Sequence, residues 1–254
     1  MRRPRIGVFK CSSCDGCQLS ILNLEEELLD LLDFFDIAYF REVTDKAPLR
    51  QYDIGIVEGS ISTERQRREI VEIREKARFL MSIGACATAG GLQALRNWAN
   101  AADYMRCVYP SPDLVKALPM STPVSDHVYL DYELWGCPID KEALAETLVS
   151  LLVGKKPGIP IYSLCMDCKM KGLSCVLVSR GEACLGPVTR AGCGVLCPSF
   201  GRACYGCFGP KEGANIDSLL RLFEEKGMSR KETVLLTDKM NTYAFRRTRI
   251  EKTD

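Results

Sequence analysis

A dense run of cysteines constrains the fold of this chain more than any other feature. Eight of the 14 cysteines lie between Cys165 and Cys207, in a segment rich in glycine and proline and without a regular apolar period. This pattern is expected of a small domain whose folding is held by what its cysteines bind. Its structure must therefore depend on bonds that the cysteines make, either to one another or to a metal or cluster.

The composition favours metal or cluster ligation over disulfides. The 254 residues are 46% hydrophobic and 26% charged with a formal net charge of +1, an ordinary globular balance that favours neither nucleic acid nor an anionic membrane as partner. No apolar run reaches the length of a bilayer span, and no leader-like pattern precedes "RIGVFKC". We therefore expect a cytoplasmic protein, and that compartment keeps thiols reduced.

Residues 1–157 alternate between strand-like and helix-like patterns, which predicts an α/β fold with a doubly wound parallel sheet. Short β-rich runs are expected at 5–9, 36–40, 52–60, 79–86 and 127–138. Helices are expected at 19–35, 62–78 and 138–154. Thr63 and Gln66 form a candidate capping box, while Pro138 and Gly154 mark the two ends of the third helix.

The remaining segments are less regular. Four prolines between Gln93 and Asp126 indicate a long excursion that is at most partly helical. The periodicity fades after Gly158, and surface helices are expected from Ile216 onward. We therefore divide the chain into a domain at 1–157 and a small loop-rich domain at 158–254.

The early cysteines all follow predicted strands. Cys11, Cys14 and Cys17 come after the first strand, "GAC" places Cys86 at the end of another, and "GCP" places Cys137 at the end of the last. Functional groups gather at the carboxyl ends of the strands in such a sheet, so these thiols can meet and hold one [4Fe–4S] cluster. The alternative is that Cys86 and Cys137 are small buried hydrophobes.

The late cysteines include two C-x2-C pairs, Cys165 with Cys168 and Cys204 with Cys207. Two such pairs also suit zinc, but a zinc site uses four cysteines and leaves four unexplained. Two [4Fe–4S] clusters use all eight. The dense segment therefore favours two clusters over one zinc ion.

These motifs resemble a known family. The C-x2-C after the first strand, "VEGSIST", "GACA", "GCP" and "ACLGPVTRAGCGVLCPSFGRACYGC" are similar to the small, electron-transferring subunit of [NiFe] hydrogenases. The cytoplasmic NAD(P)-linked or sulfhydrogenase type, with its delta subunit, is the nearest match. The resemblance implies a flavodoxin-like domain followed by an iron–sulfur domain, with three [4Fe–4S] clusters in line.

The resemblance also assigns the ligands of each cluster. The proximal cluster takes Cys14, Cys17, Cys86 and Cys137. The distal cluster takes Cys165, Cys168, Cys175 and Cys184. The medial cluster takes Cys193, Cys197, Cys204 and Cys207. Cys11 and Cys107 are left without a role, and Glu58 aligns with an acidic residue near the proximal site.

The sequence departs from periplasmic and membrane-bound relatives at three places. Cys165 stands where those proteins use a histidine ligand, and Cys197 supplies a fourth medial ligand that they often lack. Gln18 stands where an acidic residue usually follows the first C-x2-C pair, so a proton-transfer role of that acid cannot be carried over. The lone His127 has no metal-spaced partner and is expected at the surface.

The family implies a division of labour among subunits. Hydrogen is split at a nickel–iron centre on a separate large subunit, and this chain relays electrons to a flavin/NAD(P)-binding subunit and a ferredoxin-like subunit. FAD and NAD(P) are then expected on those partners, and no catalytic residue is expected here unless Glu58 contributes. The alternatives are a methanogen-type deazaflavin-reducing or heterodisulfide-linked hydrogenase and a zinc-binding interaction module. A respiratory complex I subunit fits less well, because that relative lacks the eight-cysteine domain.

Overall fold

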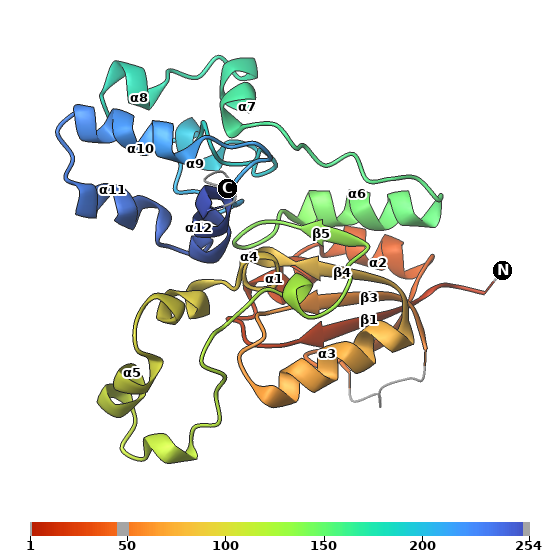
Figure 1. Cartoon of the computed structure of the whole chain (residues 1–254). Coiled ribbons are helices and arrows are strands. Elements are labelled where there is room, and N and C mark those ends of the chain that lie inside the picture. The colour runs from red at the N-terminus through yellow and green to blue at the C-terminus, as the bar shows by residue number, and fades with distance from the viewer. Residues whose placement is uncertain (1, 45–50, 251–254) are drawn as a thin grey trace.

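The computed structural model describes residues 2–44 and 51–250 and is built on a five-stranded parallel sheet (Figure 1). The strands are β1 Arg5–Lys10, β2 Asp36–Phe40, β3 Tyr52–Glu58, β4 Ala77–Ile83 and β5 Tyr132–Leu134. Their order, β2-β1-β3-β4-β5, is the flavodoxin-like order of doubly wound sheets. The predicted fold class is confirmed, although β5 is shorter than the run at 127–138 suggested.

One face of the sheet is covered by α1 Gly16–Leu22, α2 Glu26–Leu32 and α6 Lys141–Leu152. The prediction of a single helix at 19–35 is wrong, because a turn between α1 and α2 interrupts the helix. Glu25 has φ 53°, and Leu24 in this turn is 2% exposed. The turn therefore buries an apolar side chain that a continuous helix would carry away from this position.

The start of α6 also differs from the prediction. Asp140 caps the helix by accepting a hydrogen bond from the Ala143 amide over 2.9 Å. Pro138 lies outside the helix, in a cis peptide with Cys137. Gly154 follows the last turn with φ +68°, as the predicted C-terminal glycine requires.

The opposite face is covered by α3 Glu64–Lys76 and α4 Gly84–Ala89. The predicted capping box is confirmed: the Gln66 amide donates to Thr63 Oγ1 over 3.2 Å, and the Thr63 amide donates to Gln66 Oε1 over 3.1 Å. The strand predicted at 79–86 ends at Ile83, so Cys86 lies in the first turn of α4. Both features place side chains at the carboxyl edge of the sheet.

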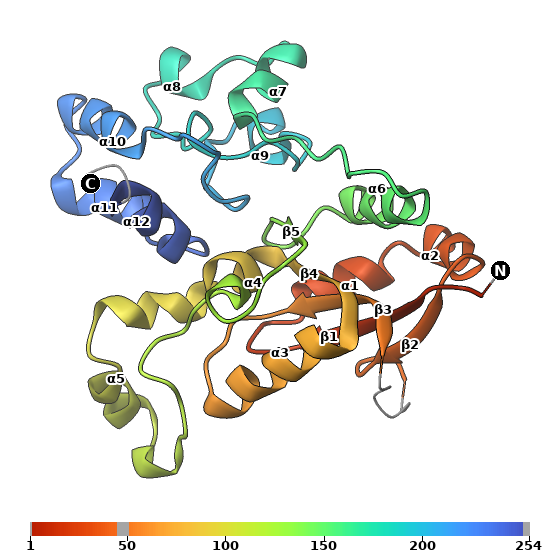
Figure 2. The same ribbon diagram turned by 45° about the vertical axis from the view of Figure 1, so that its right-hand side comes forward.

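The excursion predicted between Gln93 and Asp126 is partly helical. It contains the 3₁₀ helix η1 Leu92–Trp98, the helix α5 Ala101–Val108 and the short 3₁₀ turns η2 Pro112–Leu114 and η3 Val124–Asp126. Figures 1 and 2 show α5 projecting away from the sheet.

The C-terminal part forms a second hydrophobic core. Its helices are α7 Leu164–Met170, α8 Val176–Ser179, α9 Leu196–Ser199, α10 Ile216–Glu225, α11 Arg230–Thr237 and α12 Thr242–Ile250. Phe223 of α10 and Phe245 of α12 are each 1% exposed within this core. The helices expected at the surface from Ile216 onward therefore also bury apolar side chains in this core. The sheet core extends to Ile159 and the second core begins at Leu164. This supports a boundary near 158, which stays a prediction.

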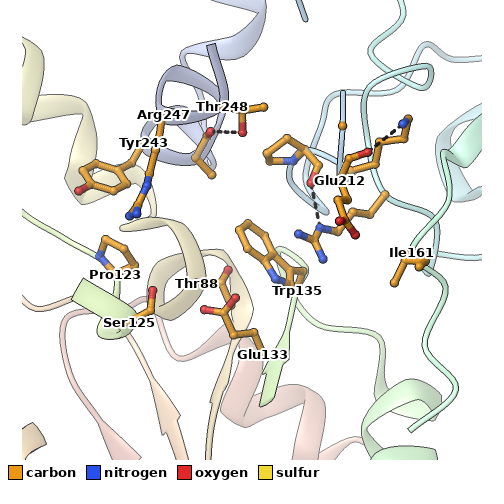
Figure 3. A pocket seen from close by; sticks show the side chains of 15 residues that line it. Thr88, Pro123, Ser125, Glu133, Trp135, Ile161, Glu212, Tyr243, Arg247 and Thr248 are labelled. Atoms are coloured by element: carbon orange, nitrogen blue, oxygen red, sulfur yellow. Dashed lines mark hydrogen bonds between the residues drawn. The ribbon is translucent and has the colours of Figure 1, made fainter. Parts of the chain in front are cut away.

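The two parts meet beside β5 at a polar cavity of about 470 Å³, and Figure 3 shows the side chains that line it. Glu133 and Trp135 enter it from the sheet, and Arg190 enters from the C-terminal part. The Arg190 guanidinium stacks over the Trp135 ring at 4.4 Å and donates to the Pro210 carbonyl over 2.9 Å. The stacking on Trp135 joins the C-terminal part to the sheet, and the bond to Pro210 fixes Arg190 within the C-terminal part.

Within the described ranges, no helix is long and apolar enough to cross a membrane.

Candidate iron–sulfur sites

The proximal cysteines come from four separate segments at the carboxyl edge of the sheet. Cys14 lies in the loop after β1, Cys17 in the first turn of α1, Cys86 in the first turn of α4 and Cys137 after β5. Gly84 lets two of these segments approach closely: its φ is +80°, and a Cβ there would overlap the Cys17 sulfur. The glycine before Cys86 is therefore required by the packing of the site.

The four proximal thiols lie within electrostatic reach of one another. Burial raises the pKa of Cys86 to about 12, and the neighbouring Cys137 and Cys14 thiols contribute to the rise. Burial likewise raises the pKa of Cys17, with smaller contributions from Cys86 and Cys137. Such thiols ionise poorly on their own, so a cationic group between them is needed to hold them as thiolates.

Four thiols at one site can hold either a single ion or a cluster. Thiolates on one zinc each lie about 2.3 Å from it, whereas a [4Fe–4S] cluster spreads its four ligands over four irons. Across residues 2–44 and 51–250, no group of three or more His, Cys, Asp or Glu side chains is placed to hold a single metal ion. The cluster assignments and the zinc alternative both stay predictions.

Glu58 ends β3 directly beneath the proximal loop and is 1% exposed. Its carboxylate accepts hydrogen bonds from the Gln18 side-chain amide over 2.7 Å, the Ser13 hydroxyl over 3.0 Å and the Cys17 backbone amide over 3.2 Å. Burial raises the pKa of Glu58, and the three donors oppose that rise. Glu58 therefore fixes the loop that carries Cys14 and Cys17.

The role of Gln18 was missed from the sequence, which showed only that an acid was replaced. Gln18 is 1% exposed and points its amide at Glu58. An acid at position 18 would face the Glu58 carboxylate, and two such groups repel unless one is protonated. A neutral amide is thus the side chain that this buried pair favours, and no local sequence signal could have revealed the pairing.

Cys11 lies apart from the proximal group. It is 7% exposed and packs with Phe9 and Val57 in the core on the α3 side of the sheet. Burial raises its pKa to about 12, and the charges that contribute come from Glu69 and Glu58. This position supports the assignment that leaves Cys11 without a cluster. Cys107 is exposed on α5.

The distal cysteines gather around α7. Cys165 and Cys168 lie on that helix, Cys175 precedes α8, and Cys184 is buried in the following loop. Burial raises the pKa of Cys165 to about 11, and the Cys184, Cys168 and Cys175 thiols contribute in that order. The structure thus brings the predicted distal set together.

The medial cysteines are likewise close in space. Burial raises the pKa of Cys207 to about 12, with contributions from Cys193 and Cys197. Burial also raises the pKa of Cys204 to about 12, with contributions from the thiols of Cys184 in the distal set and then of Cys207. These four thiols therefore form a third group.

Contacts between the three cysteine groups indicate the order in which they lie in space. Cys137 of the proximal set is near enough to raise the pKa of Cys207 in the medial set, after burial and two medial thiols. The Cys204 amide of the medial set donates to Cys184 Sγ of the distal set over 3.2 Å. The medial group therefore lies between the other two.

His127, which was expected at the surface, is half-buried. Its Nε2 lies 2.7 Å from Thr122 Oγ1, and burial lowers its pKa. This pairing explains the residue without a metal.

The model of the NADH ubiquinone oxidoreductase 20 kDa subunit family matches residues 14–151, more than half of the chain. Sulfhydrogenase 2 subunit delta of Pyrococcus furiosus is 36% identical over 221 residues, which cover 87% of this chain and 92% of that one. The chain belongs to the delta-type small-subunit family of [NiFe] hydrogenases.

Two further relatives differ in how much of this small subunit they match. A chain of the F420-non-reducing hydrogenase (vhu) of Methanococcus voltae is 33% identical over 236 residues, covering 82% of each chain. A solved NAD+-reducing [NiFe]-hydrogenase in its H2-reduced state aligns with a TM-score of 0.59 and 29% identity. The alignment covers 63% of this chain and 96% of the chain in that structure.

Proposed function

We propose that this chain relays electrons through three [4Fe–4S] clusters, between a nickel–iron large subunit and a flavin/NAD(P)-reducing subunit. The observation that carries this proposal is the series of cysteine groups, in which Cys137 approaches Cys207 and Cys204 approaches Cys184. When bound, the clusters would accept and pass on single electrons. As in its hydrogenase family, the hydrogen-activating centre belongs to the large subunit.

The chain's own residues hold the clusters and tune them. The proximal, distal and medial sets are those assigned from the sequence, with Cys165 in place of a histidine and Cys197 as the fourth medial ligand. Cys184 and Cys204 are buried, which keeps water from their sulfurs. Backbone amides that point at these sulfurs, from Cys204 to Cys184 and from Gly206 to Cys204, are the contacts that adjust a cluster's potential.

The large subunit would cover the carboxyl edge of the sheet, because the proximal group is gathered there. Cys14 is exposed at this edge, and Cys86 and Cys137 are half-buried. FAD and NAD(P) would lie on other subunits, together with a ferredoxin-like iron–sulfur subunit. We place the assembly in the cytoplasm.

A second candidate is the F420-non-reducing type of hydrogenase found in methanogens. The Methanococcus voltae relative matches this chain over 82% of its length, whereas the NAD+-reducing structure matches 63%. The sulfhydrogenase and F420-non-reducing relatives match a larger share of this chain than the NAD+-reducing structure does, which favours those two types. Because F420 is a deazaflavin, this relative favours a heterodisulfide-linked complex over a deazaflavin-reducing one as the alternative to NAD(P) reduction.

The test is purification of the native complex under anaerobic conditions, followed by H2-dependent reduction of a viologen dye. We expect nickel, a large subunit and turnover that Cys17→Ser abolishes. Cys107→Ser is the matched control, since Cys107 is exposed on α5 and should leave turnover unchanged. NADP+, NAD+ and a deazaflavin are then offered as acceptors. A complex without nickel, or turnover that survives Cys17→Ser, contradicts the proposal.

A further inference from the structure

An open apolar groove lies between α2 and α6, on the outer side of these helices. Its volume is about 660 Å³. The apolar part of the lining is Leu31, Phe34, Ala145, Val149, Leu152 and Val153. Phe34 is 60% exposed and Val153 is 62% exposed, so large apolar side chains face solvent along this groove. Contiguous apolar surface of this kind marks an interaction site.

The rest of the lining is acidic. Glu27, Asp30 and Glu142 border the groove, and its lining contains no basic residue. Among the described residues, only Glu142 of these three has an ion pair, with Lys141 at 4.0 Å. The acids near the groove therefore have little compensation within the chain.

Both helices also carry pairs of like charges one turn apart. Glu26 and Asp30 are four residues apart on α2, and Glu142 and Glu146 are four apart on α6. Like-charge pairs at this spacing destabilise a helix by a few tenths of a kcal/mol each. One member of each pair, Asp30 or Glu142, lines the groove, so cations of a partner seated there would weaken this repulsion.

The groove runs along α6 from Glu142, in the first turn of this helix, to Val153, just past its last residue. α6 begins close to Cys137 and leads away from it, so most of the apolar lining lies away from the proximal cysteines. Phe34 precedes β2, which starts at the amino edge of the sheet. In Figure 1 α2 and α6 lie toward the N-terminus, away from the arrowheads of the strands. A partner here would not compete with the large subunit.

We propose that this groove binds a lysine- and arginine-rich amphipathic helix of another subunit of the complex. The apolar face of that helix would pack on Phe34 and Val149, as in other helix-in-groove contacts. Its cations would meet Glu27, Asp30 and Glu142, which gives the contact its orientation and specificity.

The charge of the groove excludes two other occupants. A symmetric dimer would place the same patch of two copies face to face, bringing the acids of both copies together. An anionic membrane or a nucleic acid would be repelled by the same carboxylates. The proposal goes beyond the electron relay, because it assigns a second docking surface on the far side of the sheet.

The first test is site-specific photo-crosslinking in the purified complex. Benzoylphenylalanine replaces Val149 in the groove or, as a matched control, Val71 on α3 across the sheet. The two valines are 47% and 44% exposed on helices. We expect position 149 to crosslink at least tenfold more than position 71, to a basic amphipathic helix of a partner subunit. Crosslinks to a second copy of this chain, to an acidic or non-helical segment, or at the yield of position 71, overturn the proposal.

The second test compares Val149→Glu with Val71→Glu. A carboxylate in the groove floor should reduce retention of the crosslinked subunit at least tenfold, and Val71→Glu should retain it fully. Both variants should keep the large subunit and viologen reduction, which separates this proposal from the electron relay. If Val149→Glu leaves the subunit composition unchanged, the groove is not the docking site.

Discussion

The backbone amide of Cys204 donates a hydrogen bond to the sulfur of Cys184 over 3.2 Å. Cys204 belongs to the proposed medial set and Cys184 to the distal set, so this bond joins two predicted sites directly. Hydrogen bonds to ligand sulfurs are one of the means by which a protein sets the potential of a cluster. In the proposed relay, this contact would serve both the spacing of the two clusters and the tuning of their potentials.

The medial set predicts a specific result for Cys197→Ala. Without a fourth thiolate, Cys193, Cys204 and Cys207 would hold a three-iron cluster. Its oxidised form has a distinctive paramagnetic signal that the wild type should lack at this site. Electron paramagnetic resonance of the oxidised complex checks this, with Cys107→Ala as control. An unchanged spectrum and iron content would show that Cys197 is not a ligand.

The proximal set predicts that Cys11 and Cys14 respond differently to replacement. Cys11 is buried among apolar side chains, with no other cysteine among the charges that shift its pKa, so Cys11→Ala should keep hydrogen turnover. Cys14→Ser should abolish it. Turnover assays on the two complexes decide between this set and a ferredoxin-like triplet of Cys11, Cys14 and Cys17. Loss on replacing Cys11, with survival on replacing Cys86 or Cys137, would favour the triplet.

Glu58→Gln should weaken the loop that carries the proximal cysteines. The carboxylate accepts from Ser13, Cys17 and Gln18, and a glutamine would turn its own amide hydrogens toward at least one of these donors. A buried donor left unpaired costs about 1–3 kcal/mol. We expect a lower thermal midpoint and partial loss of proximal iron.

The control for Glu58 is Glu72→Gln on α3. Glu72 is exposed and pairs only with Lys76, at 3.4 Å, among the contacts described for it. Surface changes of this kind alter stability by no more than about 0.5 kcal/mol. Equal midpoints for the two variants would argue that the Glu58 hydrogen bonds do not support the loop.

The sequence predicted the sheet and the gathering of cysteines because both depend on local patterns. Apolar runs followed by a cysteine, as at Cys14, Cys86 and Cys137, determine which side chains lie at the carboxyl edge once the strands are parallel. The Thr63 and Gln66 cap was likewise predictable, because its two hydrogen bonds join residues three apart.

Features that depend on distant partners were missed. The break at Glu25 follows from burial of Leu24 against the sheet core, which no local propensity encodes. The bond between Gln18 and Glu58 joins residues 40 apart in the chain. The groove between α2 and α6 is lined by residues from two helices that are far apart in the chain.

The central claim is that this chain carries three four-iron clusters beside a nickel–iron subunit. The most direct test is metal analysis of the anaerobically purified complex of this chain with its large subunit alone. Twelve cluster irons and one iron of the nickel–iron centre predict about thirteen irons for each nickel, with no stoichiometric zinc. About nine or five irons per nickel, or one zinc per chain, would contradict the account.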